Sequence, residues 1–238
     1  MLVHSRHSAL FAAFSGAGSF VTACAASNFG QGPVPIEDGF KQAAGIVWGG
    51  TEFSLLTIYG LSFPYNAIDE TKEKSSLAKG KRFLMRAFAR AGKANLEKWT
   101  GAAAWTFLGA GNGLVAASAI TTLMTVGTAG LAPALLASLY LAYGVSGVLV
   151  NAAKIYGLMH KEPENKVAKF MHDYAVELNF SREGAGLFYY AVNGLVDPNT
   201  TAIQTAVFIA GQLLTMSGYY ALYRGQKKSK SQAPSPTP

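Results

Sequence analysis

The chain has 238 residues, long enough for one or two domains with a sizeable core, so neither a disulfide nor a metal is needed to hold it folded. Half of its residues are hydrophobic, only 14% are charged and the formal net charge is +7, whereas soluble domains carry roughly 25% charged residues. No Asp, Glu, Lys or Arg occurs between Lys98 and Lys154. This composition excludes an ordinary soluble domain and indicates a membrane protein.

Residue types that support chemistry are sparse. Cys24 is the single cysteine, which excludes an internal disulfide, and the four histidines have no metal-ligand spacing. Walker A, GxSxG and HExxH motifs are absent, and "GAGNG" at 109–113 lacks the spacing of a dinucleotide fingerprint. We identify no family resemblance, and we expect no cofactor, no metal and no catalytic activity.

Residues 1–26 open with a short basic stretch and continue as an apolar run that ends in small residues. This pattern resembles a secretory signal peptide, and an uncleaved first membrane helix fits it equally well. The stretch "VTAC", residues 21–24, resembles the lipobox of bacterial lipoproteins and makes Cys24 a candidate for lipidation. An organelle-targeting segment is a further alternative. Whether residues 1–23 are removed stays open.

Four apolar segments are long enough to cross a bilayer, which takes about 20 residues of helix. They are residues 43–66, 100–126, 132–153 and 201–223. The second and third are joined by the turn-like "GTAGLAP", so they predict an antiparallel hairpin. With the segment 1–26, the sequence predicts an all-α bundle of four or five membrane spans.

Two further segments are polar. Apolar residues recur at helical spacing among charged ones over 163–179, which predicts a hydrophilic helix packed on one side. The stretch "GLFYYAVNGLV", residues 186–196, is too short to span by itself. Residues 224–238 are basic and then rich in Pro and Ser, which predicts a disordered tail.

A basic amphipathic helix is expected over residues 77–98. Five basic residues share one of its faces, opposite an apolar face: Lys79, Arg82, Arg86, Arg90 and Lys93. Between two spans, such a helix suits contact with anionic lipid head groups, or it serves only to fix the topology. Nucleic acid is disfavoured as a partner because the basic face has no stacking aromatics. Since residues 69–98 form the most basic loop, we expect that loop on the cytoplasmic side or its organelle equivalent.

The expected spans contain a few polar side chains that could form an intramembrane site: Glu52, Asn112, Asn151, Gln204 and Gln212. A carboxylate is costly in a bilayer, so Glu52 is a candidate for proton or cation handling, unless it reaches interfacial water. Amides in membrane helices more often join helices by hydrogen bonds.

Small residues at close spacing suggest helix packing through Gly45, Gly49, Gly109, Gly113, Gly144 and Gly147. Together these features favour a structural, accessory or assembly subunit that packs against other membrane proteins or a second copy of itself. A small channel or transporter that uses Glu52 and a membrane-inserting effector or toxin are the alternatives. A bacterial inner membrane or an organelle membrane is the expected location.

Overall fold

The structure, a computed structural model, describes residues 6–26, 36–62, 93–126, 131–160, 165–196 and 200–231. All elements in these ranges are helices, and the ranges contain no strand. The helices are α1 (Arg6–Ala26), α2 (Ile36–Ser62), α4 (Lys93–Val126), α5 (Leu131–Met159), α6 (Lys166–Asp173), α7 (Ala175–Val196) and α8 (Ala202–Ser231). The expectation of an all-helical chain is confirmed for this part of the protein.

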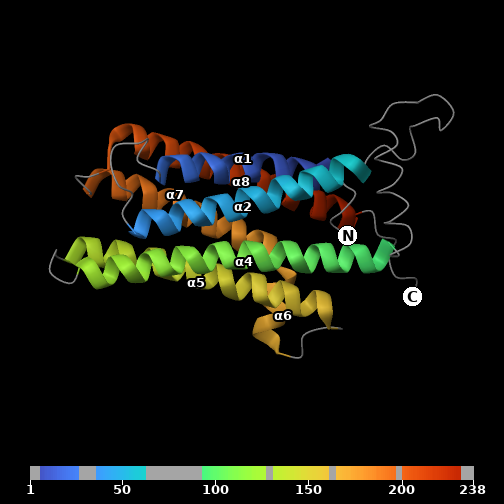
Figure 1. Cartoon of the computed structure of the whole chain (residues 1–238). Coiled ribbons are helices and arrows are strands. Elements are labelled where there is room, and N and C mark those ends of the chain that lie inside the picture. Colours follow the sequence, from blue (N-terminus) through green and yellow to red (C-terminus); the bar gives the residue numbers. More distant parts are fainter. Residues whose placement is uncertain are drawn as a thin grey trace, which may run out of the picture.

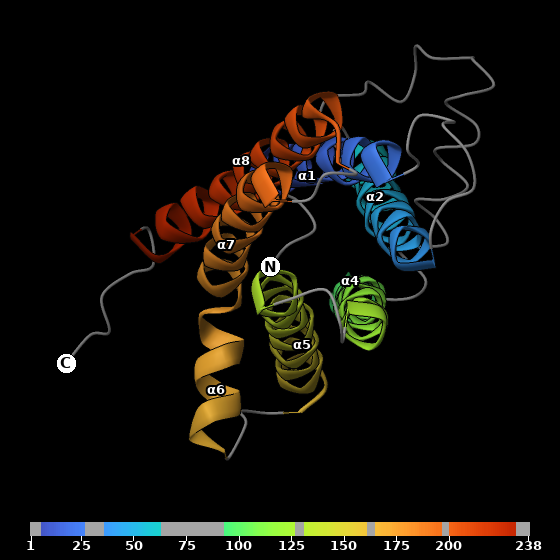
Figure 2. The ribbon, with the colours of Figure 1, turned by 90° about the vertical axis from the view of Figure 1, so that its left-hand side faces the viewer.

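Six long helices form a closed ring. Each packs on the next in the order α1, α2, α4, α5, α7 and α8, and α8 returns to pack on α1. Viewed along the bundle, these helices surround a common centre, and the short α6 lies outside the ring against α5 (Figure 2). Viewed from the side, α1, α4 and α7 end where α2, α5 and α8 begin (Figure 1). The ring is therefore an up-and-down bundle.

Two helices are long and apolar enough to cross a membrane: Gly101–Thr125 within α4 and Pro133–Met159 within α5. Only 39% and 33% of their most apolar windows are buried in the bundle. A core helix of a soluble protein would bury most of its apolar surface. The outward apolar faces of α4 and α5 therefore fit lipid better than water.

The segment between α5 and α8 differs from its expected form. The single hydrophilic helix expected over 163–179 is divided into α6 and α7 at Tyr174, whose φ of −106° and ψ of 19° end α6. Asn165 begins α6, because its side chain accepts hydrogen bonds from two backbone N–H groups of the first turn. The helix α7 runs on to Val196, so "GLFYYAVNGLV" belongs to a helix of 22 residues.

The remaining boundaries shift by smaller amounts. The helix α8 continues to Ser231, so the first part of the tail expected to be disordered is helical. The helix α2 begins at Ile36, ahead of the expected span. Of the basic helix expected over 77–98, only residues from Lys93 onward lie in α4; Lys79, Arg82, Arg86 and Arg90 lie outside the described residues.

Glycines bring neighbouring helices close together. A Cβ atom on Gly45 would lie 2.7 Å from the carbonyl oxygen of Ser19, and one on Gly144 would lie 2.7 Å from the backbone nitrogen of Ala116. Gly49 likewise contacts the ring of Phe20 on α1. The other expected packing glycines differ among themselves: Gly147 is in close contact, Gly109 is at ordinary contact distance, and Gly113 has open space around it.

Candidate functional site

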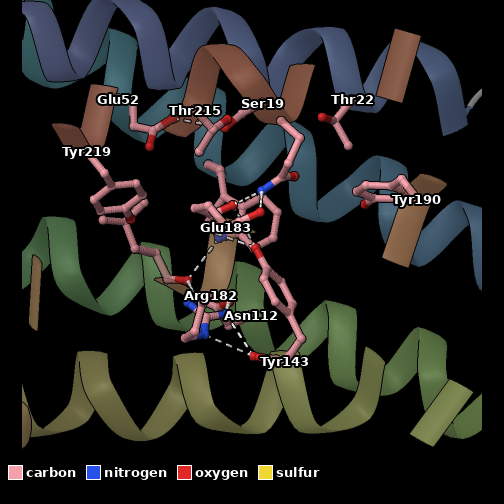
Figure 3. A pocket seen from close by; sticks show the side chains of 13 residues that line it. Ser19, Thr22, Glu52, Asn112, Tyr143, Arg182, Glu183, Tyr190, Thr215 and Tyr219 are labelled. Atoms are coloured by element: carbon pink, nitrogen blue, oxygen red, sulfur yellow. Dashed lines mark hydrogen bonds between the residues drawn. The ribbon is translucent and has the colours of Figure 1, made fainter. Parts of the chain in front are cut away.

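Polar side chains from all six ring helices meet at the middle of the bundle (Figure 3). The cavity between them is lined by Ser19, Thr22, Trp48, Glu52, Leu108, Asn112, Tyr143, Arg182, Glu183, Tyr190, Gln212, Thr215 and Tyr219. The centre of a water molecule can move over about 20 Å³ of it, which is enough for at least one buried water. We call this the central cavity.

Arg182, on α7, is the hub of the lower half of the cavity in Figure 3. Its Nη2 donates to Asn112 Oδ1 at 2.6 Å and to the carbonyl oxygen of Tyr143 at 2.8 Å. Its Nη1 donates to Asn179 Oδ1 at 2.7 Å, and its Nε donates to Ser146 Oγ at 3.1 Å. One guanidinium thus ties α4, α5 and α7 together, which uses the fixed fork of donors that only arginine provides.

Glu183, the next residue on α7, lies at the centre of the cavity. The hydroxyl of Tyr143 donates to its two carboxylate oxygens, at 3.0 and 2.9 Å. The side-chain amide of Gln212, on α8, donates to the same carboxylate and, at 3.0 Å, to the backbone carbonyl of Glu183. The Arg182 guanidinium lies 4.3 Å from the centre of the Tyr143 ring, so it stacks on the phenol that holds Glu183.

Glu52, on α2, occupies the opposite side of the cavity, near Thr215 and Ser19 (Figure 3). Only 2% of it is exposed. The hydroxyl of Ser15 donates to one carboxylate oxygen, and the hydroxyl of Ser19 donates to the other at 3.0 Å. A Cβ atom on Gly16 would lie 3.3 Å from Glu52 Cβ, so α1 closes tightly over this side chain.

The helical repeat explains why α7 delivers these groups to the centre. Val176, Asn179, Glu183, Gly186 and Tyr190 recur every three or four residues, and all are buried. Residues at this spacing share one face of a helix. On α7 that face is polar in the middle and apolar at both ends, so burying it places the polar groups halfway along the bundle.

Apolar clusters lie on both sides of the polar centre along the bundle. The first gathers side chains from all six ring helices toward the ends of α1, α4 and α7: Ala25, Ala26, Ala44, Val115, Ala119, Leu136, Tyr140, Tyr189, Tyr190 and Phe208. The second joins α1, α7 and α8 at the other end through Phe11, Val176, Tyr219 and Leu222. The central cavity is therefore enclosed between two apolar layers.

The charges in the cavity do not balance. Glu52 and Glu183 are two carboxyl groups, and Arg182 is the single guanidinium among the lining residues. The hydrogen bonds of Arg182 end on amide, hydroxyl and carbonyl oxygens of the described chain. An uncompensated charge is costly in a buried site of low dielectric constant. A proton or a small cation in the cavity would restore neutrality.

The polar residues proposed from the sequence divide into two groups. Glu52, Asn112 and Gln212 line the central cavity. Asn151 is buried on α5 outside the cavity lining, and its Oδ1 has no hydrogen-bond partner in the described residues. Gln204 lies near the start of α8, where its side chain accepts from the backbone and hydroxyl of Thr201.

Sequence reasoning missed Arg182 and Glu183, which supply two of the three charges of the cavity. Cys24, the lipidation candidate, is an exposed residue on α1 that does not line the central cavity. Glu183 stands three residues before Gly186 and seven before Tyr190 on the buried face of α7, but this spacing identifies a buried face only once the fold is known.

Comparisons of this chain with protein-family models, with curated proteins and with solved structures found no significant match.

Proposed function

We propose that this chain is an integral membrane protein whose six-helix ring crosses the bilayer and carries a proton or a small monovalent cation through the central cavity. Every ring helix has at least 21 residues. About 20 residues of helix cover the roughly 30 Å of bilayer hydrocarbon. The number of spans proposed here is six, in place of the four or five expected from hydropathy, because α1 and α7 complete the ring.

The distribution of basic residues supports this topology. In a six-span arrangement, residues 27–35, 127–130 and 197–201 connect helices at one end, and they contain no Lys or Arg. Of the 20 Lys and Arg residues, all but Lys41 and Arg182 belong to sequence segments that this six-span arrangement assigns to the opposite end, which we call the basic end. The positive-inside rule places such an end on the cytoplasmic side, where anionic lipid head groups would also attract it.

The charge imbalance of the central cavity is the observation that carries the proposal. Ionisable residues inside a membrane face the bundle interior and mark ion or proton pathways. Here two buried carboxyl groups share one cavity with one guanidinium. A purely structural polar core would be expected to balance its charges, since leaving one unpaired lowers stability.

The test is ion flux in liposomes that contain the purified full-length chain. A pH-sensitive dye and a sodium-sensitive dye inside the vesicles report proton and sodium entry under an imposed gradient. We expect flux of one of these ions, and we expect the double variant Glu52→Gln with Glu183→Gln to lose it. Both substitutions keep size and hydrogen-bonding capacity while they remove the charge.

The matched control is Glu177→Gln, which removes an acid from the first turn of the same helix, outside the cavity lining. It should leave flux unchanged. Flux that is equal in wild type, the double variant and empty vesicles would reject transport of these ions.

An accessory subunit is the second candidate function, and a groove on the outside of the ring favours it. Ile46, Val47, Gly50, Leu55 and Phe107 are among the residues that line an apolar groove of about 390 Å³ between α2 and α4. Such grooves can receive a helix of a partner membrane protein. Gentle extraction from the native membrane, followed by the mass of the intact particle, tests this role: a stoichiometric companion supports it, and a particle of this chain alone contradicts it.

A further inference from the structure

The two carboxyl groups of the central cavity have different kinds of hydrogen-bond partner. Glu183 accepts from the amide N–H₂ of Gln212 and from the hydroxyl of Tyr143. Glu52 accepts from two serine hydroxyls, those of Ser15 and Ser19. The kind of partner decides whether a carboxyl group can take up a proton without losing its contacts.

Glu183 favours the ionised form more than Glu52 does, because one of its partners is a fixed donor and the Arg182 guanidinium belongs to the neighbouring residue. The Gln212 amide nitrogen can only donate, so it requires an acceptor oxygen opposite it. A proton on that oxygen would set two donors against each other. The neighbouring Arg182 and the Tyr143 phenol on which it stacks add further positive and donor character around Glu183.

Glu52 is matched to both forms. A serine hydroxyl has one donor and two acceptor positions and can rotate between them. When Glu52 is ionised, Ser15 and Ser19 donate to it, as in the structure. When Glu52 is protonated, its own O–H can donate to one of these hydroxyls while the other continues to donate to the second oxygen. The side chain can therefore gain or lose a proton without rearrangement of α1 or α2.

The charged and titratable groups facing Glu52 favour the same assignment. Across the cavity stand Arg182, Glu183 and Tyr190 on α7, Tyr143 on α5 and Tyr219 on α8, while α1 and α4 contribute no charged residue to the lining. Arg182 directly precedes Glu183 in the chain, and its guanidinium donates to oxygens on α4, α5 and α7. If Arg182 compensates Glu183, Glu52 is the group left without a cation.

From these contacts we infer that Glu52 is the proton-carrying residue of the central cavity, that Ser15 and Ser19 position it, and that Glu183 stays ionised as the fixed partner of Arg182. This inference rests on the proposed function and names the ion, a proton, and its site. In the forward step a hydronium ion in the cavity gives its proton to a Glu52 oxygen, which forms the O–H bond and leaves a water molecule. In the reverse step that bond breaks, and water takes the proton toward the opposite side.

Infrared spectroscopy of the purified full-length protein tests the assignment without any transport. A protonated carboxylic acid has a C=O stretching band that carboxylates lack and that shifts when the protein is moved from H₂O to D₂O. At neutral pH, exposed acids are ionised, so a band reports a buried acid. We expect the band in the wild type and in Glu183→Gln, and we expect its loss in Glu52→Gln.

The serine positions provide a second readout that depends on the hydrogen bonds alone. Ser15→Ala with Ser19→Ala should shift the frequency of the C=O band, because the acid loses its hydrogen-bond partners. The matched control is Thr22→Val, since Thr22 lines the same cavity but donates to the Gly18 carbonyl of its own helix. That control should leave the frequency unchanged. If Glu52→Gln does not fold, Glu52→Asp should move the band instead of abolishing it.

Two results would overturn the assignment: a band that survives Glu52→Gln and disappears in Glu183→Gln, or no band in the wild type. The second result would mean that both acids are ionised. Transport can fail separately. A Glu52 band without ion flux would reject the proposed function and leave the assignment in place, whereas flux without a Glu52 band would reject the assignment and leave transport in place.

Discussion

The guanidinium of Arg182, on α7, lies directly against the backbone of Gly147, on α5. A Cβ atom on Gly147 would come within 2.3 Å of Arg182 Nη2 and equally close to Asn112 Oδ1. The hydrogen bond between these two groups, 2.6 Å long, therefore passes over a position where any side chain would collide with it. A glycine on α5 thus makes room for the contact between α4 and α7.

Gly147→Ala should consequently destabilise the protein. Overpacking of a filled interior typically costs about 1–3 kcal/mol, and here the displaced atoms belong to a buried charged network. Thermal unfolding of the detergent-solubilised protein measures the effect. Gly113→Ala is the control, because Gly113 has nothing within 4 Å of its Cβ position and alanine favours helix over glycine by about 1 kcal/mol. Equal stability of the two variants would contradict the packing described here.

Arg182→Ala should destabilise more strongly than Gly147→Ala. It removes the donors to Asn112, Asn179 and the carbonyl of Tyr143 and leaves Glu183 without its neighbouring cation. Breaking a buried charged network typically costs about 3–5 kcal/mol.

Arg182→Lys should recover only part of that loss, because an ammonium group cannot reproduce the planar fork. The control is Arg224→Ala on the exposed side of α8, where surface substitutions change stability by about 0.5 kcal/mol or less. Full recovery of stability by lysine would show that charge alone is needed.

The sequence predicts where the helices lie better than it predicts which face of each helix is buried. The uncharged run between Lys98 and Lys154 predicts α4 and α5, because an apolar run of that length is typical of membrane-spanning helices. Glu52, Asn112 and Gln212 could be selected because a polar residue is conspicuous among apolar neighbours. Arg182 and Glu183 could not, since they follow a segment of mixed charges that is typical of an exposed helix. Their burial depends on the ring closing around α7, which is a tertiary effect.

The topology of the C-terminal tail follows from α7. If α7 crosses the membrane, residues 224–238 lie on the same side as residues 63–92; if it did not, they would lie on opposite sides. We expect single cysteines at Ser231 and at Ser75, each in a chain with Cys24→Ser, to react with a membrane-impermeant thiol reagent from the same face of sealed vesicles. A cysteine at Thr128, in the connection between α4 and α5, should react only from the other face. Labelling of the first two positions from opposite faces would exclude the six-span arrangement.

The stability of the α5–α6 contact should depend on pH through His172. Its imidazole lies against Gly157, where a Cβ atom would meet Nδ1 at 2.1 Å, and Nδ1 has no hydrogen-bond partner in the described residues. Burial, and then the nearby Lys154 ammonium, lower the pKa of His172 below its usual value of 6.5. The fold therefore favours neutral imidazole. Its contribution is complete above about pH 6.5, the usual pKa, and is lost as the pH falls from there through the lowered pKa of the folded protein. Unfolding temperatures at neutral and mildly acidic pH should differ less in His172→Gln than in the wild type, and an unchanged difference would contradict this assignment.

Residues 6–26 should remain in the mature protein. The helix α1 fills the ring between α2 and α8, and it approaches α8 so closely that a Cβ atom on Gly18 would lie 2.4 Å from the Gly211 carbonyl. Cleavage before Cys24 would remove Ser15 and Ser19, both partners of Glu52, and expose the buried faces of both neighbouring helices. The intact mass of the protein purified from membranes should therefore correspond to a chain that includes α1. A mass that matches a chain beginning at or after Cys24 would contradict the closed ring.

The packing of α1 on α8 has its own test in the same preparations. Gly18→Leu should reduce the yield of folded protein, whereas Gly50→Leu, at a position with nothing within 4 Å of its Cβ, should not.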